Sequence, residues 1–506
     1  MFDEVGDIPT PPERIDPGGT PLPPALPVPV LGSPPEEGRD DLLAAHDYVP
    51  GLEVRAPSGA MNRALANLDA LTVLNDVSTQ GRPATDAEQD TLARWSGWGA
   101  VPQMFEPHRH QWDGAQQSLR EVLTEAQYRE AAATTLNAHY TDPAVARDVW
   151  SFLHAAGFTG GRVLEPGSGA GTFIGQAPES ANMVGVELDS ATARISALLY
   201  PSAQVRNEGF ELTRVPENSF VATVGNVPFG KYALHDPAHN PHSHSIHNHF
   251  ILKSLALTAP GGYVAVLSSR YTLDAGNPRA RQEMAGAADL VGAVRLPTGA
   301  FSRVAGTEVV TDLIVLRKRG QDEAAHADQG WVHVQPVEVA GPDGENTTIE
   351  INAYFAEHPD RVLGQLRTGH GQFGSDDLIV RGPVGAEMGG NLRGALAAIN
   401  REAQAHQLSL DAFADNTMAA NDRLFDRGMV TAATADRPPC WTRCAMTRAP
   451  SRCAAGMVRA GWPTRPDRRS WVSSASCWRY ATPHRPSSTP TTPTPLPPSA
   501  TGYGVS

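Results

Sequence analysis

Between Gly161 and Arg319, short β-rich runs alternate with helical segments, and this alternation limits the possible folds more than any other feature of the sequence. The pattern is typical of an α/β fold in which a parallel sheet is connected by crossover helices. Because the carboxyl ends of parallel strands meet at one edge of the sheet, we expect the residues that follow these strands to line one crevice.

A glycine-rich turn follows the first of these strands. The stretch "GRVLEPGSGAGTF" runs from an apolar strand into glycines 167, 169 and 171. Such a turn lets the backbone approach a ligand, although it also occurs as a tight strand-to-helix turn with no ligand. Glu165 stands just before the glycines, where it would repel a phosphate. A cationic or zwitterionic ligand is therefore favoured.

The next two strands add an acidic residue and an aromatic residue to the same edge. The strand in "MVGVELDS" ends at Glu187, about twenty positions after the glycines, where a carboxylate can accept hydrogen bonds from ribose hydroxyls. We interpret Asp189 as the N-cap of the following helix. Phe210, after the third strand in "AQVRNEGFE", fits a purine-stacking position or plain core packing equally well.

The fourth strand, "SFVATV", leads into the stretch "GNVPFG". The side-chain oxygen of Asn226 and the backbone carbonyl of Val227 can together accept two hydrogen bonds from one exocyclic amine and stabilise the charge that develops on it. Pro228 fixes the turn, and Phe229 offers a face for stacking. The stretch is suited to hold a planar group that bears an amine.

The order Glu-Pro-x-x-Gly-x-Gly, acidic strand end, Asn-x-Pro-Phe resembles that of the N6-adenine-specific DNA methyltransferases. The resemblance implies a Rossmann-like seven-stranded sheet, S-adenosylmethionine as cofactor, and DNA as substrate with the target adenine flipped out of the duplex. It implies that Asn226, Val227, Pro228 and Phe229 hold the adenine. The residues implied to bind the cofactor are Tyr140, Thr141, Glu165, Pro166, Gly167, Gly169, Gly171, Glu187 and Phe210.

The resemblance covers residues from about 90 to 382 and extends to a particular subset of that family. The motif "LNAHYTDPAVARDVW" before the glycine turn is similar to the gamma order of motifs, and two runs after residue 289 resemble the antiparallel hairpin that closes the fold. "SIHNHF" and "INAYFAEHPDRVLG" are similar to methylases of phages and mobile elements, which precede a helicase. The resemblance thus implies a restriction-modification role and a helicase partner.

The sequence departs from the family pattern at several points. Val227 replaces a proline, which is tolerable because this position acts through its carbonyl. Gly209 stands where an aspartate is usual, so Glu208 or Glu211 must substitute if the amine of adenine is read. No target-recognition domain is recognisable, and the helicase is absent from the chain.

We expect five parts along the chain. They are a disordered Pro-rich N-terminus (1–45), a helical region (60–156), the methyltransferase domain (157–320), an irregular extension (321–430) and a tail (436–506). The tail holds all four cysteines and, with ten arginines and two aspartates, a net charge of +8. Its lack of period is typical of a disordered or out-of-frame segment, and both readings are favoured over a zinc site at Cys440 and Cys444.

The charge of −14 on the whole chain disfavours indiscriminate binding to nucleic acid, so contact with DNA requires a local basic surface. The arginines that we expect to supply it are Arg270, Arg279, Arg281, Arg295 and Arg303, although scattered solvated charges explain them nearly as well. No apolar run approaches the length of a membrane span, and the acidic N-terminus is unlike a signal peptide, so we expect a cytoplasmic protein.

Two further clusters in the sequence have a structural and a functional interpretation. The histidine-rich "HDPAHNPHSHSIHNHF" is interpreted as a polar loop that contacts substrate phosphates, in preference to a metal site, and we predict no metal. Trp95 and Trp98 are interpreted as packing at a helix end rather than as a nucleic-acid platform.

Two other functions fit the same motifs. One is methylation of adenine in RNA or of glutamine in proteins, because similar Asn-Pro-Pro-aromatic sites serve those substrates. The other is a truncated, inactive methylase–helicase fragment that only binds DNA.

Overall fold

The computed structural model describes residues 44–51, 55–135, 141–301, 309–327, 329–341, 344–371, 374–411 and a short strand at 429–430. The predictions made for the N-terminus and the tail concern residues almost wholly outside these ranges.

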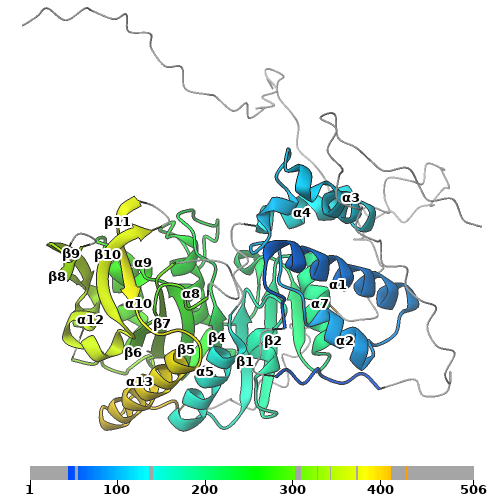
Figure 1. Ribbon diagram of the computed structural model, residues 1–506. Helices are drawn as coiled ribbons and strands as arrows, with labels where there is room; N and C mark the ends of the chain where they lie inside the picture. The colour runs from blue at the N-terminus through cyan, green and yellow to red at the C-terminus, as the bar shows by residue number, and fades with distance from the viewer. Residues whose placement is uncertain are drawn as a thin grey trace, which may run out of the picture. The chain divides into compact units, whose positions relative to one another are not determined.

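The large sheet has the strand order β12-β3-β2-β1-β4-β5-β7-β6 (Figure 1). Neighbours from β3 to β5 are parallel, whereas β7 runs antiparallel to both β5 and β6, and β12 runs antiparallel to β3. The strands are β1 (Gly161–Pro166), β2 (Ala181–Glu187), β3 (Gln204–Asn207), β4 (Phe220–Asn226), β5 (Thr258–Ser269), β6 (Ala288–Arg295), β7 (Thr311–Lys318) and β12 (Met429–Val430). The predicted seven-stranded Rossmann-like sheet and its closing hairpin are confirmed, with β12 added at one edge.

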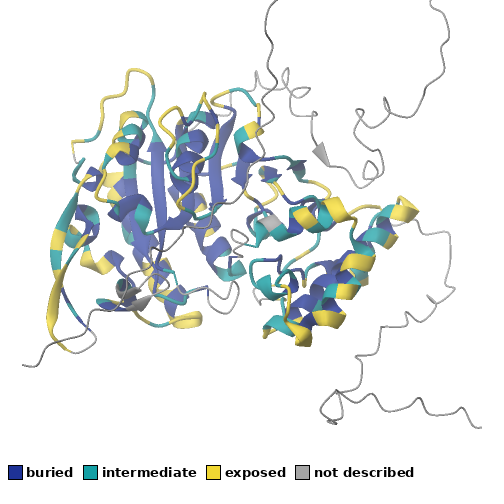
Figure 2. Cartoon of the chain, turned by 90° about the horizontal axis from the view of Figure 1, so that it is seen from above, coloured by how far each residue is buried: buried dark blue, intermediate teal, exposed yellow. Residues whose placement is uncertain are grey.

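The central strands β4 and β5 are largely apolar because both faces of the sheet are covered. Along β5, Tyr263 and Ala265 face one hydrophobic core, while Val264 and Val266 face the other, and all four are fully buried. In Figure 2 the strands of this sheet are accordingly dark blue. The alternation is that of side chains pointing to opposite faces of a strand.

The helices divide between the two faces. The first core is closed by α1 (Ala60–Gln80), α5 (Pro143–Ala156), α7 (Ser190–Leu199) and α13 (Ala386–Ala405). The second core is closed by α8 (Ile246–Leu257), α10 (Arg279–Ala287) and α12 (Ala353–Glu357). The remaining described helices are α2 (Asp86–Leu92), α3 (Asp113–Val122), α4 (Glu125–Thr134), α6 (Thr172–Gly175) and α9 (Tyr271–Asp274). None of the described helices combines the length and apolarity that a membrane crossing requires.

Local sequence explains where the helices next to the crevice begin and end. Asp142 caps α5 by accepting a hydrogen bond from the amide of Ala144, with Pro143 at the first helical position. Gly157 ends this helix in the left-handed conformation, at φ 117°. Asp189 caps α7 by accepting a hydrogen bond from the amide of Thr192, as predicted from the sequence.

The extension at 321–430 is not irregular in its described part, and this prediction was wrong. It forms a second sheet of order β11-β10-β8-β9, seen beside α12 in Figure 1. Its strands are β8 (Val334–Ala340), β9 (Asn346–Asn352), β10 (Gln365–Gly371) and β11 (Gly374–Arg381). Pro336 within β8 and the half-exposed faces of β8 and β9 weakened the strand pattern in the sequence.

Candidate active site

A cleft lies at the carboxyl ends of β1, β2, β3 and β4. It encloses about 1130 Å³ with its open mouth included, slightly above the roughly 300–1,000 Å³ that is typical of small-molecule sites. Among its described lining residues none is basic and five are acidic, namely Glu165, Glu187, Asp189, Glu208 and Glu211. In their ionised form these carboxylates repel phosphate and attract a cation.

The glycine turn forms the floor of this cleft through Gly167 and Gly169, which have φ of 69° and 55°. The buried carboxylate of Glu165 accepts hydrogen bonds from the amides of Phe173, at 3.4 Å, and Ile174, at 3.1 Å. These amides belong to α6, so Glu165 holds the turn against that helix. Burial raises the pKa of Glu165 well above its ordinary value, although the two amides oppose this shift.

Glu187 lies at the end of β2 and joins two segments of the cleft. One carboxylate oxygen accepts a hydrogen bond from the amide of Gly169 at 2.9 Å, and the other from the amide of Asp189 at 2.8 Å. Burial raises the pKa of Glu187 to about 7 despite these bonds. The carboxylate is thus fixed in position, with lone pairs left for a ligand.

Phe210 forms an aromatic wall after β3. Its ring packs against Phe250 at a centroid distance of 4.8 Å, while Lys253 lies 5.1 Å from its centroid. The wall continues across the cleft, because a Cβ built on Gly167 would stand 3.7 Å from the rings of Pro228 and Phe250. Phe210 is thus packed in the core, as one of its two sequence interpretations predicted, and it also lines the cleft.

Most of the predicted site residues meet in this cleft. Those among its lining residues are Thr141, Glu165, Gly167, Gly169, Glu187, Phe210, Asn226 and Pro228. Those not among them are Pro166, Gly171, Val227 and Phe229, and Tyr140 lies outside the described residues. Gly171 has a packing role, because a Cβ there would stand 2.9 Å from the Tyr200 ring.

The sequence did not single out several residues that line the cleft. They are Gly97, Thr134, Ser168, Thr172, Val186, Leu188, Thr192, Tyr232, Leu234, Ile246 and Phe250, and Trp98, which was interpreted only as packing, lines the cleft as well. Most are apolar or lie on the helical region and on α8, so only the fold brings them here. Of the two proposed substitutes for the missing aspartate, Glu208 is paired with Arg206 at 2.7 Å, whereas Glu211 has no ion-pair partner in the described ranges.

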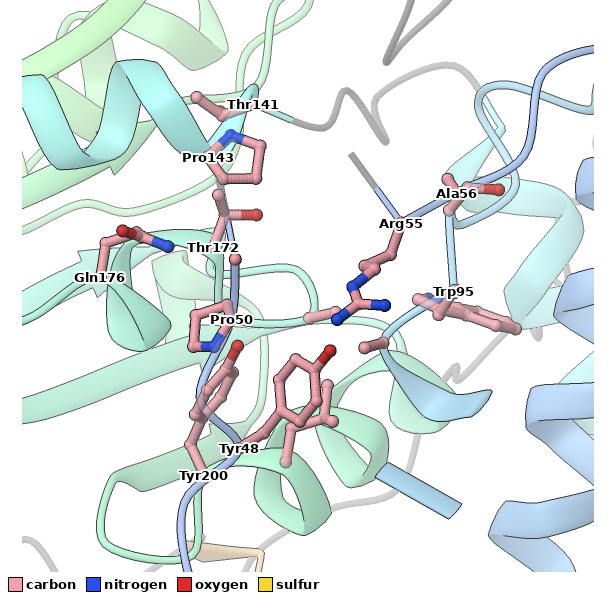
Figure 3. A pocket seen from close by; sticks show the side chains of 15 residues that line it. Tyr48, Pro50, Arg55, Ala56, Trp95, Thr141, Pro143, Thr172, Gln176 and Tyr200 are labelled. Atoms are coloured by element: carbon pink, nitrogen blue, oxygen red, sulfur yellow. The ribbon is translucent and has the colours of Figure 1, made fainter. Parts of the chain in front are cut away.

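A second pocket, of which Tyr48, Arg55 and Tyr200 are lining residues, is seen from close by in Figure 3. Arg55 points into it, with the rings of Tyr48 and Tyr200 nearby. Thr141 and Thr172 line both this pocket and the cleft, so the two meet at these threonines.

The histidine-rich segment differs from its interpretation as a polar loop. His247 and His249 are buried on α8, and burial lowers the pKa of both, that of His247 to about 4. Buried neutral imidazoles are unsuited to phosphate contact, so the prediction was wrong for these two residues. His242 and His244 instead lie beside Glu283 of α10.

The expected basic surface is also corrected. Arg281 is buried, with its guanidinium on the carbonyls of Val332, Thr272 and Ala275. Arg295 is fully buried between two aspartates, and Arg303 lies outside the described residues.

Two of these arginine positions remain partly accessible. The side chain of Arg270 is 14% exposed and pairs with Asp377, while that of Arg279 is 55% exposed. Trp95 and Trp98 are buried in edge-to-face contact at 5.1 Å, which confirms that they pack the helical region.

Comparisons with known proteins give distant matches to this chain. No protein-family model matches it. Over 264 residues it is 28% identical to the Defense against restriction protein B of Escherichia phage P1; the match covers 51% of this chain and 10% of that protein. The chain therefore spans about a tenth of the length of this relative.

Solved structures with a similar arrangement are distant. A type I restriction-modification methyltransferase subunit from Streptococcus thermophilus is 13% identical, with 68% of this chain and 79% of that chain covered and a TM-score of 0.35. A TehB-like S-adenosylmethionine-dependent methyltransferase from Corynebacterium glutamicum is 14% identical, with 38% and 95% covered and a TM-score of 0.24. At these scores the likeness identifies no substrate, and the fold assignment rests on the strand order.

Proposed function

We propose that this chain is an S-adenosylmethionine-dependent methyltransferase that methylates the N6 amine of adenine in DNA. The observation that carries the proposal is the composition of the cleft: among its described lining residues five are acidic and none is basic, and Asn226 and Pro228 line it together with the glycine turn. A dinucleotide or nucleoside triphosphate would place phosphates against these carboxylates, whereas a sulfonium cation is attracted by them.

The cofactor would lie along the carboxyl ends of the first three strands. The carboxylate of Glu187 would accept the ribose hydroxyls, and the Gly167–Gly169 turn would approach the methionine part. The ring of Phe210 would stack on the purine, with Glu211 as the acceptor for its amine in place of the aspartate that Gly209 replaces. When bound, the cofactor supplies a methyl group on a positively charged sulfur.

The Asn226–Phe229 segment would hold the target base. Asn226 stands at the end of β4, and the amide of Val227 is fixed on the carbonyl of Leu267 at 3.0 Å, so the segment leaves the sheet in a defined direction. Its oxygens would accept the two amine hydrogens and stabilise the positive charge as the N6–methyl bond forms and the sulfur–methyl bond breaks. One amine proton is then released.

The phage relative supports DNA as the substrate, because it is named for defence against restriction, and restriction is an attack on DNA. The sequence resemblance to methylases that precede a helicase supports a helicase module as partner. The DNA substrate and the helicase partner are therefore parts of the proposal. The match covers only 10% of the phage relative, so that protein's role does not establish them for this chain.

The test is to incubate the full chain with methyl-labelled S-adenosylmethionine and unmodified duplex DNA, and to assay N6-methyladenine after nucleoside digestion. We expect labelled adenine from the native chain and a loss of at least about 100-fold in Asn226→Ala, the scale of removing one transition-state hydrogen-bond acceptor. Asn182→Ala, the same change at the exposed opposite end of β2, should leave the label unchanged.

Other substrates are separated by the same assay with RNA and with cellular protein. Label in RNA adenine or in protein glutamine, with none in DNA, would replace DNA as the substrate. Cofactor binding without transfer to any of these would indicate a fragment that lacks a required part. Absence of cofactor binding would refute the proposal.

A further inference from the structure

Two histidines of the segment after β4 and one glutamate of α10 converge on a point outside the cleft. His242 Nδ1 lies 2.7 Å from one carboxylate oxygen of Glu283, and His244 Nε2 lies 3.0 Å from the other. The three ligand-type atoms are all within 4.8 Å of one another. Two imidazole nitrogens and one carboxylate oxygen form a common donor set of protein zinc sites.

His244 distinguishes this group from an ordinary surface ion pair. Its side chain is only 9% exposed, and its buried Nε2 makes no hydrogen bond within the described part of the chain, although it lies 3.0 Å from a carboxylate oxygen of Glu283. A buried polar nitrogen left unsatisfied costs roughly 1–3 kcal/mol, so a ligand that takes its lone pair would remove a penalty.

The segment that carries both histidines is held in shape by its own polar contacts. Asn240 donates hydrogen bonds to the carbonyls of Leu234 and His244 and accepts one from the amide of His244 at 2.8 Å. Asp236, at the start of the same segment, is fixed to α8 through Lys253 at 2.9 Å. The donor atoms are therefore presented by a pre-shaped loop, which lowers the cost of ordering a metal site.

The distances fit a metal after small side-chain movements. Bonds of 2.0–2.1 Å to a tetrahedral zinc place ligand atoms roughly 3.3 Å apart, which is longer than the two histidine–glutamate distances and within the 4.8 Å limit that holds for the three atoms. Arg279 Nε lies 3.6 Å from Glu283, but its side chain is 55% exposed and can withdraw. Three protein donors would leave a fourth position for water.

We propose that His242, His244 and Glu283 form a binding site for Zn²⁺ or a similar borderline transition-metal ion. The ion links the 234–245 segment to α10. This segment borders the cleft, since Tyr232, Leu234 and Ile246 line it. The metal is thus a structural clamp beside the target-base side of the cleft, and the proposal does not depend on the methyltransferase assignment.

The test uses the full chain, freed of metal by a chelator and with its four cysteines alkylated, titrated with Zn²⁺ by calorimetry. We expect one bound equivalent, and a loss in affinity of more than about 100-fold in His244→Gln and in Glu283→Gln, since even outer-sphere changes cost 10- to 100-fold. His242→Asn removes a side chain that is 41% exposed, so the loss it causes does not depend on a change in folding. His235→Asn, an exposed histidine of the same segment, is the matched control and should bind like the native chain.

Amide hydrogen exchange gives a second readout of the metal-dependent link between the 234–245 segment and α10. Zn²⁺ should slow amide hydrogen exchange across residues 235–245 in the native chain and in His235→Asn, but not in Glu283→Gln. Binding that is absent, that is lost equally in the control, or that survives in both His242→Asn and Glu283→Gln would overturn the proposal.

Discussion

Glu187 and Gly169 are joined by a hydrogen bond of 2.9 Å from the backbone amide of the glycine to the carboxylate. This contact links the end of β2 to the turn after β1, so the two sequence motifs act as one unit. The second oxygen is held by the amide of Asp189. The chain thus orients the carboxylate before any ligand arrives, which reduces the entropy lost on binding.

Replacing Glu187 with glutamine should weaken cofactor binding. The amide has one accepting oxygen where the carboxylate has two, so it cannot receive both backbone amides and the ribose hydroxyls. A hydrogen bond to a charged group contributes about 1.5–3 kcal/mol, which predicts a 10- to 100-fold rise in the dissociation constant of S-adenosylmethionine measured by calorimetry. Glu179→Gln, an exposed site before β2, should bind as the native chain does; equal affinity in both variants would contradict the role of Glu187.

Cofactor binding should strengthen as the pH rises through about 7. Burial raises the pKa of Glu187 to about 7, and its ionised form accepts hydrogen bonds best, so the ligand must displace a proton below this pH. Calorimetry in two buffers of different ionisation enthalpy should detect proton release at pH 6 and little at pH 8.5. The Glu187→Gln variant should show no such release, and proton uptake by the native chain would contradict the assignment.

The same raised pKa acts on folding with a defined sign. Between the ordinary glutamate pKa and about 7, the folded chain binds more protons at Glu187 than the unfolded chain does. The contribution of this residue to stability therefore falls as the pH rises across that window. The fixed carboxylate favours the site at some cost to the fold.

The arrangement of the site was predictable because it depends on strand ends. A buried strand is recognised by its apolar run, and parallel strands bring their carboxyl ends together, so Glu187, Phe210 and Asn226 could be placed at one edge from the sequence. The burial of β5 on both faces is consistent with the same kind of apolar run in the sequence. Asp189 was readable as a helix cap from its position alone.

What the sequence could not show depends on partners distant along the chain. Arg295 resembles a surface charge, yet Asp274 and Asp312 neutralise it in the core. Gly171 resembles a ligand-binding glycine, but it is a glycine here because the Tyr200 ring leaves no room for a side chain. His249 is buried because Asp236 accompanies it. Burial of a charged group becomes favourable only with such a partner, which no local pattern shows.

Gly171→Ala should destabilise the fold rather than act on the ligand directly. The glycine has φ of 86°, and an added Cβ would stand 2.9 Å from the Tyr200 ring and from Ser196. Backbone strain and overpacking together predict a loss of about 1–3 kcal/mol in the free energy of unfolding, seen as a lower melting temperature. Gly114→Ala, in α3 with open space around it, should be neutral or stabilising by up to about 1 kcal/mol. Equal melting temperatures for the two variants would refute the packing role of Gly171.

Asp236→Asn should destabilise the chain more than any surface charge change. Asp236 and Lys253 are fully buried and 2.9 Å apart, so the variant leaves a buried ammonium without its counter-charge. We expect a cost of about 3–5 kcal/mol in the free energy of unfolding, measured by chemical denaturation.

The effect of Asp236→Asn should depend on pH. Burial opposes ionisation of Asp236, but the hydrogen bond and the charge of Lys253 outweigh burial and lower the pKa of Asp236. The aspartate therefore stabilises the fold above the ordinary aspartate pKa of about 3.9 and loses this effect as the pH falls further, so the difference from the native chain should shrink in acid. Adding Lys253→Met should recover part of the loss, and the exposed Asp322→Asn should have no effect. If the double variant is no more stable than Asp236→Asn, the unpaired lysine is not the cause.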